Sequence, residues 1–483
     1  MRAQSAKRGG GLIAAASGVA ARASNQLFLI AVILVATRYL GPAEFGVFSI
    51  AVIFTTLSRT LLYAGPFEYL MKASDVEGAG LACLQATLAM SALTALVTVG
   101  IALGSPLLFA SQSIGALMLV LIPSNFIAAF ASWQESVLLR GGKLPRYYVV
   151  TTGVELAGAG VAIALLLKGF GVYALAAQIY ARSILLAICY RLMIRLPRLR
   201  RDATPVSVVL RWSVSRYGSV VVNTLGNYSG DLVLGVVLSP AAAGLYRASN
   251  RVAAAVTDMF AQPASMISMT SLSRSFARSE RSGGRFLHIF AGVAMLGWPA
   301  LLGVAIMADE LTPIVLGQKW SAAAPIVSIL AVEKLFNLAN VVTVAYLVVH
   351  DKQHHLFRVQ LAAACVALVL VVALASSSGV IGAAVAALIV TFGSSLALLS
   401  LAALDAAPSR ADWSQTAIVV GAPSLATIAG TLAGRALGLR IDAAAWAQLA
   451  VPIGCGVLAW ACAALLLRKR LWRTLQALNT HAS

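Results

Sequence analysis

Charged residues are scarce in this chain, and acidic ones are the scarcest. Of 483 residues only 11% are charged, with 17 Asp or Glu against 36 Lys or Arg. A chain that is also 60% hydrophobic carries more apolar surface than a soluble domain can bury. Its apolar runs are long and uninterrupted, unlike the alternating runs of a membrane β-barrel. The sequence therefore predicts an all-α integral membrane protein.

Cysteine and histidine are also few, which limits the chemistry that this chain can perform. The five cysteines lie apart in apolar stretches, and no C-x-x-C or Cys/His spacing occurs. These spacings exclude a disulfide framework and give no metal site. The sequence also lacks the phosphate-binding motif G-x-x-x-x-G-K-[ST], which argues against ATP hydrolysis in this chain. We therefore expect no metal, no cofactor and no catalytic residues.

The net charge of +19 would fit a nucleic-acid partner only if the cations formed a binding face. Instead they lie in short loops between about 14 predicted spans. With the amino terminus inside, the cytoplasmic loops hold 23 Lys or Arg and the opposite loops hold 5. This asymmetry is typical of membrane orientation. It predicts that both termini are cytoplasmic and that nucleic acid is not a partner.

The sequence also repeats itself. LGPAEFGVF at 40–48 has a counterpart in LSPAAAGLY at 238–246, and GVYALA at 171–176 has one in GVIGAA at 379–384. The turns RGGK at 140–143 and HDKQ at 350–353 follow the fourth and tenth spans. Six spans thus recur as the next six, and an even number gives parallel repeats with a binding site expected at their interface. We predict an N-lobe at 1–200, a C-lobe at 201–405, and two extra spans with a cytoplasmic tail at 406–483.

Two phrases resemble a known family. RYLGPAEFGVF at 38–48, followed by an apolar span, resembles the amino-terminal signature of polysaccharide flippases of the multidrug/oligosaccharidyl-lipid/polysaccharide exporter superfamily. GDLVLGVVLSPAAAGLYRASNRV at 230–252 is similar to the pattern of that family's seventh and eighth spans. The resemblance covers most of the first twelve spans and implies a MATE-like fold with two six-helix lobes around a central cavity. The two extra spans are similar to those of flippases with 14 spans.

The same resemblance implies a function. Such proteins move undecaprenyl-diphosphate-linked oligosaccharide repeat units, for O-antigen or exopolysaccharide, to the periplasmic leaflet of the bacterial inner membrane by alternating access. The implied partners are this lipid-linked substrate, membrane lipids and other polysaccharide-assembly proteins. A transporter of this kind is not an enzyme.

Polar residues recur at helical spacing within several spans and form stripes. Intramembrane charge is costly and usually faces a bundle interior or a wet cavity. Arg presents a fork of donors suited to phosphate oxygens, so a cationic cavity is expected to bind a diphosphate. The predicted cavity-lining residues are Arg22, Asn25, Gln26, Arg59, Asn223, Asn227, Arg247, Asn250, Arg251, Lys334 and Asn337.

Three carboxylates in these stripes have a different expected role. Asp231, Asp258 and Glu333 are candidates for pairing with Arg in the empty transporter, or for binding a coupling H⁺ or Na⁺. Plainer interpretations stay open for several polar residues. Four arginines lie nearer span ends and are candidates for extending their side chains to the membrane surface: Arg182, Arg211, Arg216 and Arg247. The Asn and Gln side chains are candidates for hydrogen bonds between helices.

Two other functions stay open from the sequence alone. A multidrug or small-solute antiporter of the same superfamily should have an acidic cavity with few Arg, which the deep cations argue against. A membrane enzyme of polysaccharide assembly, a polymerase or ligase, needs an extramembrane face for chemistry. The predicted periplasmic loops are very short, which argues against the enzyme.

Overall fold

The computed structural model describes residues 24–73, 75–142, 144–194, 204–277, 283–438, 445–468 and 470. Within these ranges every regular element is a helix and no strand occurs, so the all-α prediction is confirmed. Eleven of the described helices are long and apolar enough to cross a membrane. The contacts divide the chain into two units, of which unit 1 ends at Gly244 and unit 2 begins at Leu245.

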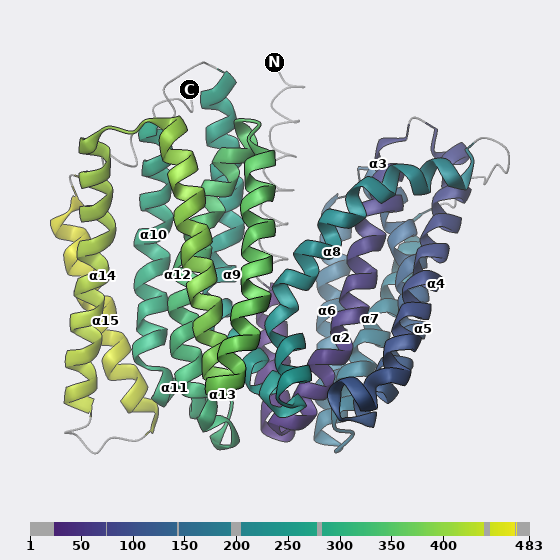
Figure 1. Cartoon of the computed structure of the whole chain (residues 1–483), viewed down its shortest axis with the longest axis horizontal. Helices are drawn as coiled ribbons and strands as arrows, with labels where there is room; N and C mark the ends of the chain where they lie inside the picture. The colour runs from purple at the N-terminus through teal and green to yellow at the C-terminus, as the bar shows by residue number, and fades with distance from the viewer. Residues whose placement is uncertain are drawn as a thin grey trace. The chain divides into compact units, whose positions relative to one another are not determined.

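The first described helix of unit 1 is Ser24–Tyr39, and eight further helical segments follow it in this unit before α9. In order these are α2 (Pro42–Leu62), η1 (Tyr63–Phe67), α3 (Glu68–Lys72), α4 (Val76–Phe109), α5 (Gln112–Arg140), α6 (Leu144–Leu167), α7 (Val172–Met193) and α8 (Val206–Val237). Figure 1 shows α4 beside α5, and α5 and α6 each pack against α7. Helix α8 packs against η1, α2 and α4 and therefore belongs to unit 1 by contact. The predicted lobe boundary at 200/201 was placed from the sequence repeat. Contacts between helices do not test a repeat, so this boundary stays a prediction.

The turns that start these helices follow from local chemistry. Pro42 is the first residue of α2, where its missing N–H leaves no donor unsatisfied, and Glu44 accepts from the N–H of Gly41 at 3.0 Å. Asp75 caps α4 by accepting from the N–H groups of Glu77 and Gly78 at 3.0 and 3.1 Å. These side chains fix where two neighbouring helices begin.

Helix α2 does not continue regularly into α3. The five residues of η1, YAGPF, form a π-helical segment that contains Pro66. Pro lacks a backbone donor, and a π segment is a local widening of the helix often found at functional sites. The side chain of Arg59 leaves the helix one turn before this segment, and that of Tyr63 leaves it at the segment's first residue.

Unit 2 contains most of α9 (Pro240–Ala277) and all later helices. These are α10 (Gly283–Ile306), α11 (Ala308–Val315), η2 (Gln318–Ala323), α12 (Ala324–Val349), α13 (Gln353–Ala406), α14 (Arg410–Gly438) and α15 (Ala445–Leu466). Helix α10 packs against α12 and α14, and α15 packs against α14 (Figure 1). Arg435 joins α14 to α11, since its guanidinium lies 3.2 Å from an Asp309 oxygen and 2.5 Å from a Glu310 oxygen.

Helix α13 corresponds to two predicted spans, 358–375 and 379–403. Its 54 residues are interrupted at Gly379, where φ is 64° and ψ is −143°. The chain folds back there. A Cβ on Gly382 would lie 1.9 Å from the carbonyl oxygen of Leu374, which a straight helix would hold about two turns away. The two predicted spans are therefore present as a hairpin. The total of about 14 spans stays a prediction.

Repeat-related positions share an unusual backbone conformation. Gly171 and Gly379, 208 residues apart, have φ of 58° and 64° and nearly equal ψ of −139° and −143°. Gly142 and Asp351 occupy the equivalent turns that were predicted to be cytoplasmic, and they also have positive φ, 72° and 56°. Among the described residues positive φ occurs at only eight positions, so its recurrence at matching offsets is what a duplicated chain predicts.

Candidate functional site

Two arginines and a carboxylate meet within unit 1. Arg59 on α2 donates from Nη2 to the hydroxyl of Ser183 on α7 at 2.7 Å. Arg182, the residue before Ser183 on α7, forms an ion pair with Glu155 on α6. The Nε of Arg182 lies 2.6 Å from the Oε1 of Glu155. Glu155 and Arg182 lie near the middle of their helices. The charges are therefore placed where a membrane-spanning helix tolerates them least.

The two guanidinium groups are close enough to repel each other, and Glu155 attracts both. Arg182 keeps 46% of its side chain exposed, whereas the Nε of Arg59 is buried without a hydrogen-bond partner. Buried donors are normally satisfied, so an unused one beside a second Arg marks a place for an acceptor. We name Arg59, Arg182, Glu155 and Ser183 the arginine cluster.

A second polar group lies nearer the end of α5. The carboxylate of Glu135 is buried, with 5% of the residue exposed. Its Oε2 accepts from the hydroxyl of Tyr63 at 2.6 Å and its Oε1 from that of Tyr147 at 2.8 Å. The ring of Tyr190 stacks on Tyr147 with centroids 6.1 Å apart. We name Glu135, Tyr63 and Tyr147 the Glu135 site.

Unit 2 holds a cluster of both signs. Lys334 forms an ion pair with its neighbour Glu333 at 2.7 Å, and the other Glu333 oxygen accepts from Thr391 at 2.8 Å. Both side chains are largely buried. The carboxylate of Asp258 on α9 is acted on by Arg251 and by Lys334. Arg251 of α9 and Lys334 of α12 thus both lie within electrostatic range of Asp258 of α9, and Glu333 is paired with Lys334.

The other predicted residues are more scattered. Arg22 lies outside the described residues, as does the side chain of Asn223. Asn25 and Gln26 lie half-buried on the helix Ser24–Tyr39, Asn227 and Asn337 are exposed, and Asn250 is half-buried on α9. Asp231 on α8 and Arg247 on α9 are buried. These residues are divided between the two units, and a single cavity shared by all of them stays a prediction.

Several residues of these sites escaped the sequence analysis. Glu135, Tyr63 and Tyr147 were not singled out, and neither was Glu155. For Arg182 the sequence left open that its side chain extends toward the membrane surface, and in the structure it forms an ion pair with Glu155. An inventory of carboxylates inside predicted spans would have found both glutamates, because each stands in a long apolar run.

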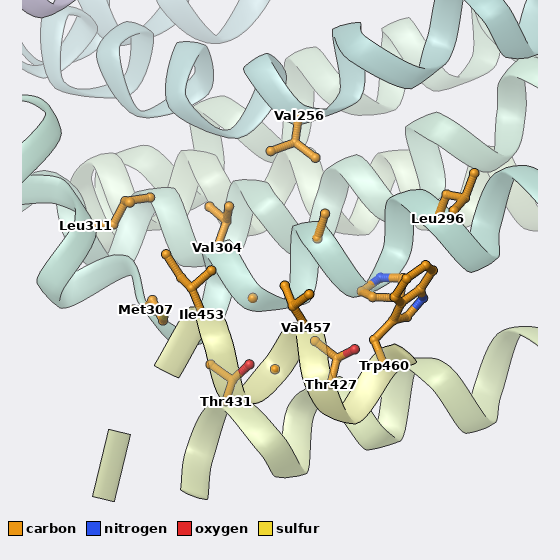
Figure 2. A pocket seen from close by; sticks show the side chains of 14 residues that line it. Val256, Leu296, Val304, Met307, Leu311, Thr427, Thr431, Ile453, Val457 and Trp460 are labelled. Carbon is orange, nitrogen blue, oxygen red and sulfur yellow. The ribbon is translucent and has the colours of Figure 1, made fainter. Parts of the chain in front are cut away.

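A cavity among the described helices of unit 2 is apolar. Its volume is about 430 Å³, and it lies among α9, α10, α11, α14 and α15. Figure 2 shows Val256 of α9 on one side and Ile453, Val457 and Trp460 of α15 on another. Thr427 and Thr431 supply the few polar atoms of the wall. This cavity suits hydrocarbon and not a charged group.

Curated relatives match parts of the chain. The succinoglycan biosynthesis transport protein ExoT of Rhizobium meliloti is 25% identical over 181 residues, 37% of each chain. The lipopolysaccharide biosynthesis protein WzxC of Escherichia coli is 28% identical over 140 residues, 28% of each chain. The chain thus matches only about a third of the length of these relatives.

Solved structures resemble the whole fold at low identity. The lipid II flippase MurJ in an inward closed conformation has a TM-score of 0.77, with 13% identity over 95% of this chain and 99% of that one. An inward-facing multidrug resistance MATE family transporter of the MOP superfamily has a TM-score of 0.62, with 14% identity over 80% of this chain and 98% of that one. The predicted MATE-like fold is therefore confirmed, and the chain is a multi-pass membrane protein.

A family model described as polysaccharide biosynthesis protein matches residues 35–325. This range is more than half of the chain and includes the arginine cluster and the Glu135 site. The chain belongs to this polysaccharide biosynthesis protein family.

Proposed function

We propose that this protein moves undecaprenyl-diphosphate-linked oligosaccharide repeat units from the cytoplasmic to the periplasmic leaflet of the bacterial inner membrane. The observation that carries the proposal is the arginine cluster, in which Arg182 in the middle of α7 and Arg59 in the last turn of α2 come together within an apolar bundle. A family of polysaccharide biosynthesis proteins and a fold similar to a lipid II flippase support the same conclusion. The activity is transport, and both termini are cytoplasmic.

The chemistry of the cluster fits a diphosphate. A phosphate oxygen accepts several donors at once, and a guanidinium group offers a planar fork of them. In the empty protein Glu155 neutralises Arg182, which lowers the cost of holding that charge among apolar helices. An entering diphosphate supplies new acceptors for Arg182 and for the unused Nε of Arg59. The apolar cavity of unit 2 offers surface to the hydrocarbon of such a substrate.

A small-solute antiporter is the second candidate, and the mixed-charge cluster of unit 2 is the observation that favours it. Asp258 and Glu333 are carboxylates within helices and are candidates for binding H⁺ or Na⁺. A drug-resistance assay in an efflux-deficient host separates the two functions. The flippase proposal expects no resistance from expression of this chain, and resistance would favour the antiporter.

The direct test uses the full chain reconstituted in liposomes with a fluorescent prenyl-diphosphate-linked oligosaccharide. We expect Arg59→Gln and Arg182→Gln each to slow translocation roughly ten- to a hundredfold, because hydrogen bonds to charged groups are worth about 1.5–3 kcal/mol. Arg410→Gln, at the exposed first residue of α14, is the matched control and should transport normally. Unfolding temperatures show whether the variants fold.

Three outcomes would contradict the proposal. They are equal transport of a prenyl-linked sugar that lacks the diphosphate, normal transport by both cluster variants, and no movement of the lipid by the wild type. In the native host, deletion should leave the lipid-linked saccharide on the inner leaflet. Arg22→Ala and Arg251→Ala should abolish export there while insertion stays normal.

A further inference from the structure

The function proposed above gives no role to the Glu135 site, although it is a buried carboxylate in an apolar helix. Within the described part of the chain no cation lies within ion-pair distance of either Glu135 oxygen. Both oxygens instead accept from neutral tyrosine hydroxyls. A buried charge without a paired ion is costly, whereas a protonated carboxyl group is not. The two tyrosine hydroxyl groups can donate to a charged Glu135 and can accept from a protonated one.

The groups around Glu135 come from three other elements. Tyr63 approaches from η1, Tyr147 from α6, and Tyr190 and Arg182 from α7. Arg182 is the cation among them, and its own ion pair is with Glu155. Arg182 thus favours the charged form of Glu135 only from a distance, and no group fixes the carboxylate permanently in one state.

Protonation would change the hydrogen bonds of this site. A carboxylate accepts from both tyrosines, whereas a carboxyl group also has a proton to donate, and the two hydroxyl oxygens are acceptors beside it. A tyrosine that accepts this proton has to turn its own hydroxyl hydrogen away from Glu135. The Tyr63 residue is 40% exposed while its hydroxyl donates to Glu135, so this side chain extends from the surface of the unit to the carboxylate.

Tyr63 connects this change to the arginine cluster. It is the first residue of η1 and lies four residues after Arg59, on the same side of the helix. The π segment and Pro66 interrupt regular backbone hydrogen bonding there, so the helix can adjust at that point. Arg59 and Tyr63 also interact electrostatically.

We propose that Glu135 is a proton-binding site whose occupancy is transmitted through Tyr63 and η1 to Arg59. The site takes one proton and no metal ion, since its other ligands are hydroxyl groups that already donate to the carboxylate. Its link to transport rests on the function proposed above. Proton binding itself does not, and it can be measured without any substrate.

Infrared difference spectroscopy of the purified full chain tests proton binding. Acidification should produce carbonyl-stretch bands of protonated carboxyl groups, and Glu135→Gln should lack the component of this band that Glu135 contributes in the wild type. Glu68→Gln is the matched control, because Glu68 lies on α3 and its ion pair is with Arg216. Tyr63→Phe keeps the ring but removes a donor to the charged form, so the band should appear at a higher pH. An unchanged band in Glu135→Gln overturns the proposal, and if that variant does not fold, an unchanged band in Tyr63→Phe does so.

A second measurement tests the link to transport in liposomes at a series of pH values. The wild-type rate should vary with pH, by at most about tenfold per pH unit for a single proton. Glu135→Gln should give a rate independent of pH, and Glu68→Gln should behave as the wild type. A pH dependence that survives in Glu135→Gln overturns the link. If the wild type moves no lipid at all, the proposed function fails instead, and the infrared result still decides whether Glu135 binds a proton.

Discussion

Gly46 and Gly244 occupy equivalent places in the two repeated phrases, and each approaches the other's helix start. A Cβ on Gly46 would lie 1.7 Å from the carbonyl oxygen of Pro240, and one on Gly244 would lie 2.0 Å from that of Pro42. Only the absence of side chains allows the starts of α2 and α9 to pack so closely. The repeated P-x-x-x-G pattern therefore has a packing reason as well as an evolutionary one.

This contact predicts the effect of adding one methyl group. Gly46→Ala should lower the free energy of unfolding by about 1–3 kcal/mol, because the new Cβ meets rigid backbone and the helices must separate. Gly100→Ala on α4 is the control, since its surroundings are open. Thermal unfolding of the purified chain in detergent measures both. Equal unfolding temperatures for Gly46→Ala and the wild type would show that the close approach is not needed.

At the residue scale the sequence predicted part of the candidate site. Arg59 was expected to be deep in its span, and the structure places it beside Arg182 within unit 1. Glu155 could not be paired with Arg182 by helical spacing, because the two stand on different helices joined by a turn. Glu135 and its tyrosines come from three elements, and periodicity within one element does not show such a meeting.

At the element scale the hairpin of α13 shows what glycine contributes. Gly379 has φ of 64° and ψ of −143°, and Gly171 has nearly the same values at the start of α7. Residues other than glycine rarely adopt this conformation, at a strain of about 1–3 kcal/mol. The repeated G-V motif at 171 and 379 thus records a backbone requirement of both turns.

A substitution at either glycine tests this requirement. We expect Gly379→Ala and Gly171→Ala each to destabilise the protein by about 1–3 kcal/mol through backbone strain. Gly393→Ala lies in regular helix on the same α13, in open space, and should be neutral or slightly stabilising. Chemical unfolding curves give the comparison. If Gly379→Ala is as stable as Gly393→Ala, the turn does not depend on glycine.

Most helices could be predicted because their apolar runs match the length of a membrane span. The π segment η1 could not, since YAGPF reads from sequence as a simple interruption by Gly and Pro. Its geometry depends on α8, which packs so closely that a Cβ on Gly65 would lie 2.4 Å from the Tyr217 hydroxyl. Such close tertiary contacts leave no periodic signal in the sequence.

At the scale of the whole molecule the distribution of Lys and Arg predicts the orientation of the chain. Lys and Arg outnumber Asp and Glu by 36 to 17, and the predicted cytoplasmic loops hold most of the cations. In this predicted orientation the Glu135 site would lie toward the cytoplasmic end of α5 and the arginine cluster nearer mid-membrane. A diphosphate that enters from the cytoplasm would therefore pass Glu135 before it reaches Arg59.

The same orientation predicts a dependence on membrane potential. Moving about two negative charges outward across an inside-negative potential of about 100 mV gains roughly 4–5 kcal/mol, at about 2.3 kcal/mol per charge. A potassium gradient with valinomycin sets this potential in liposomes that contain the full chain. Translocation of the diphosphate-linked lipid toward the positive side should accelerate and the reverse direction should slow. A neutral prenyl-linked sugar, if it moves, should show no such asymmetry. Equal rates for the charged lipid in both directions would mean that its charge is neutralised throughout transport, for example by protons taken up at carboxylates such as Glu135.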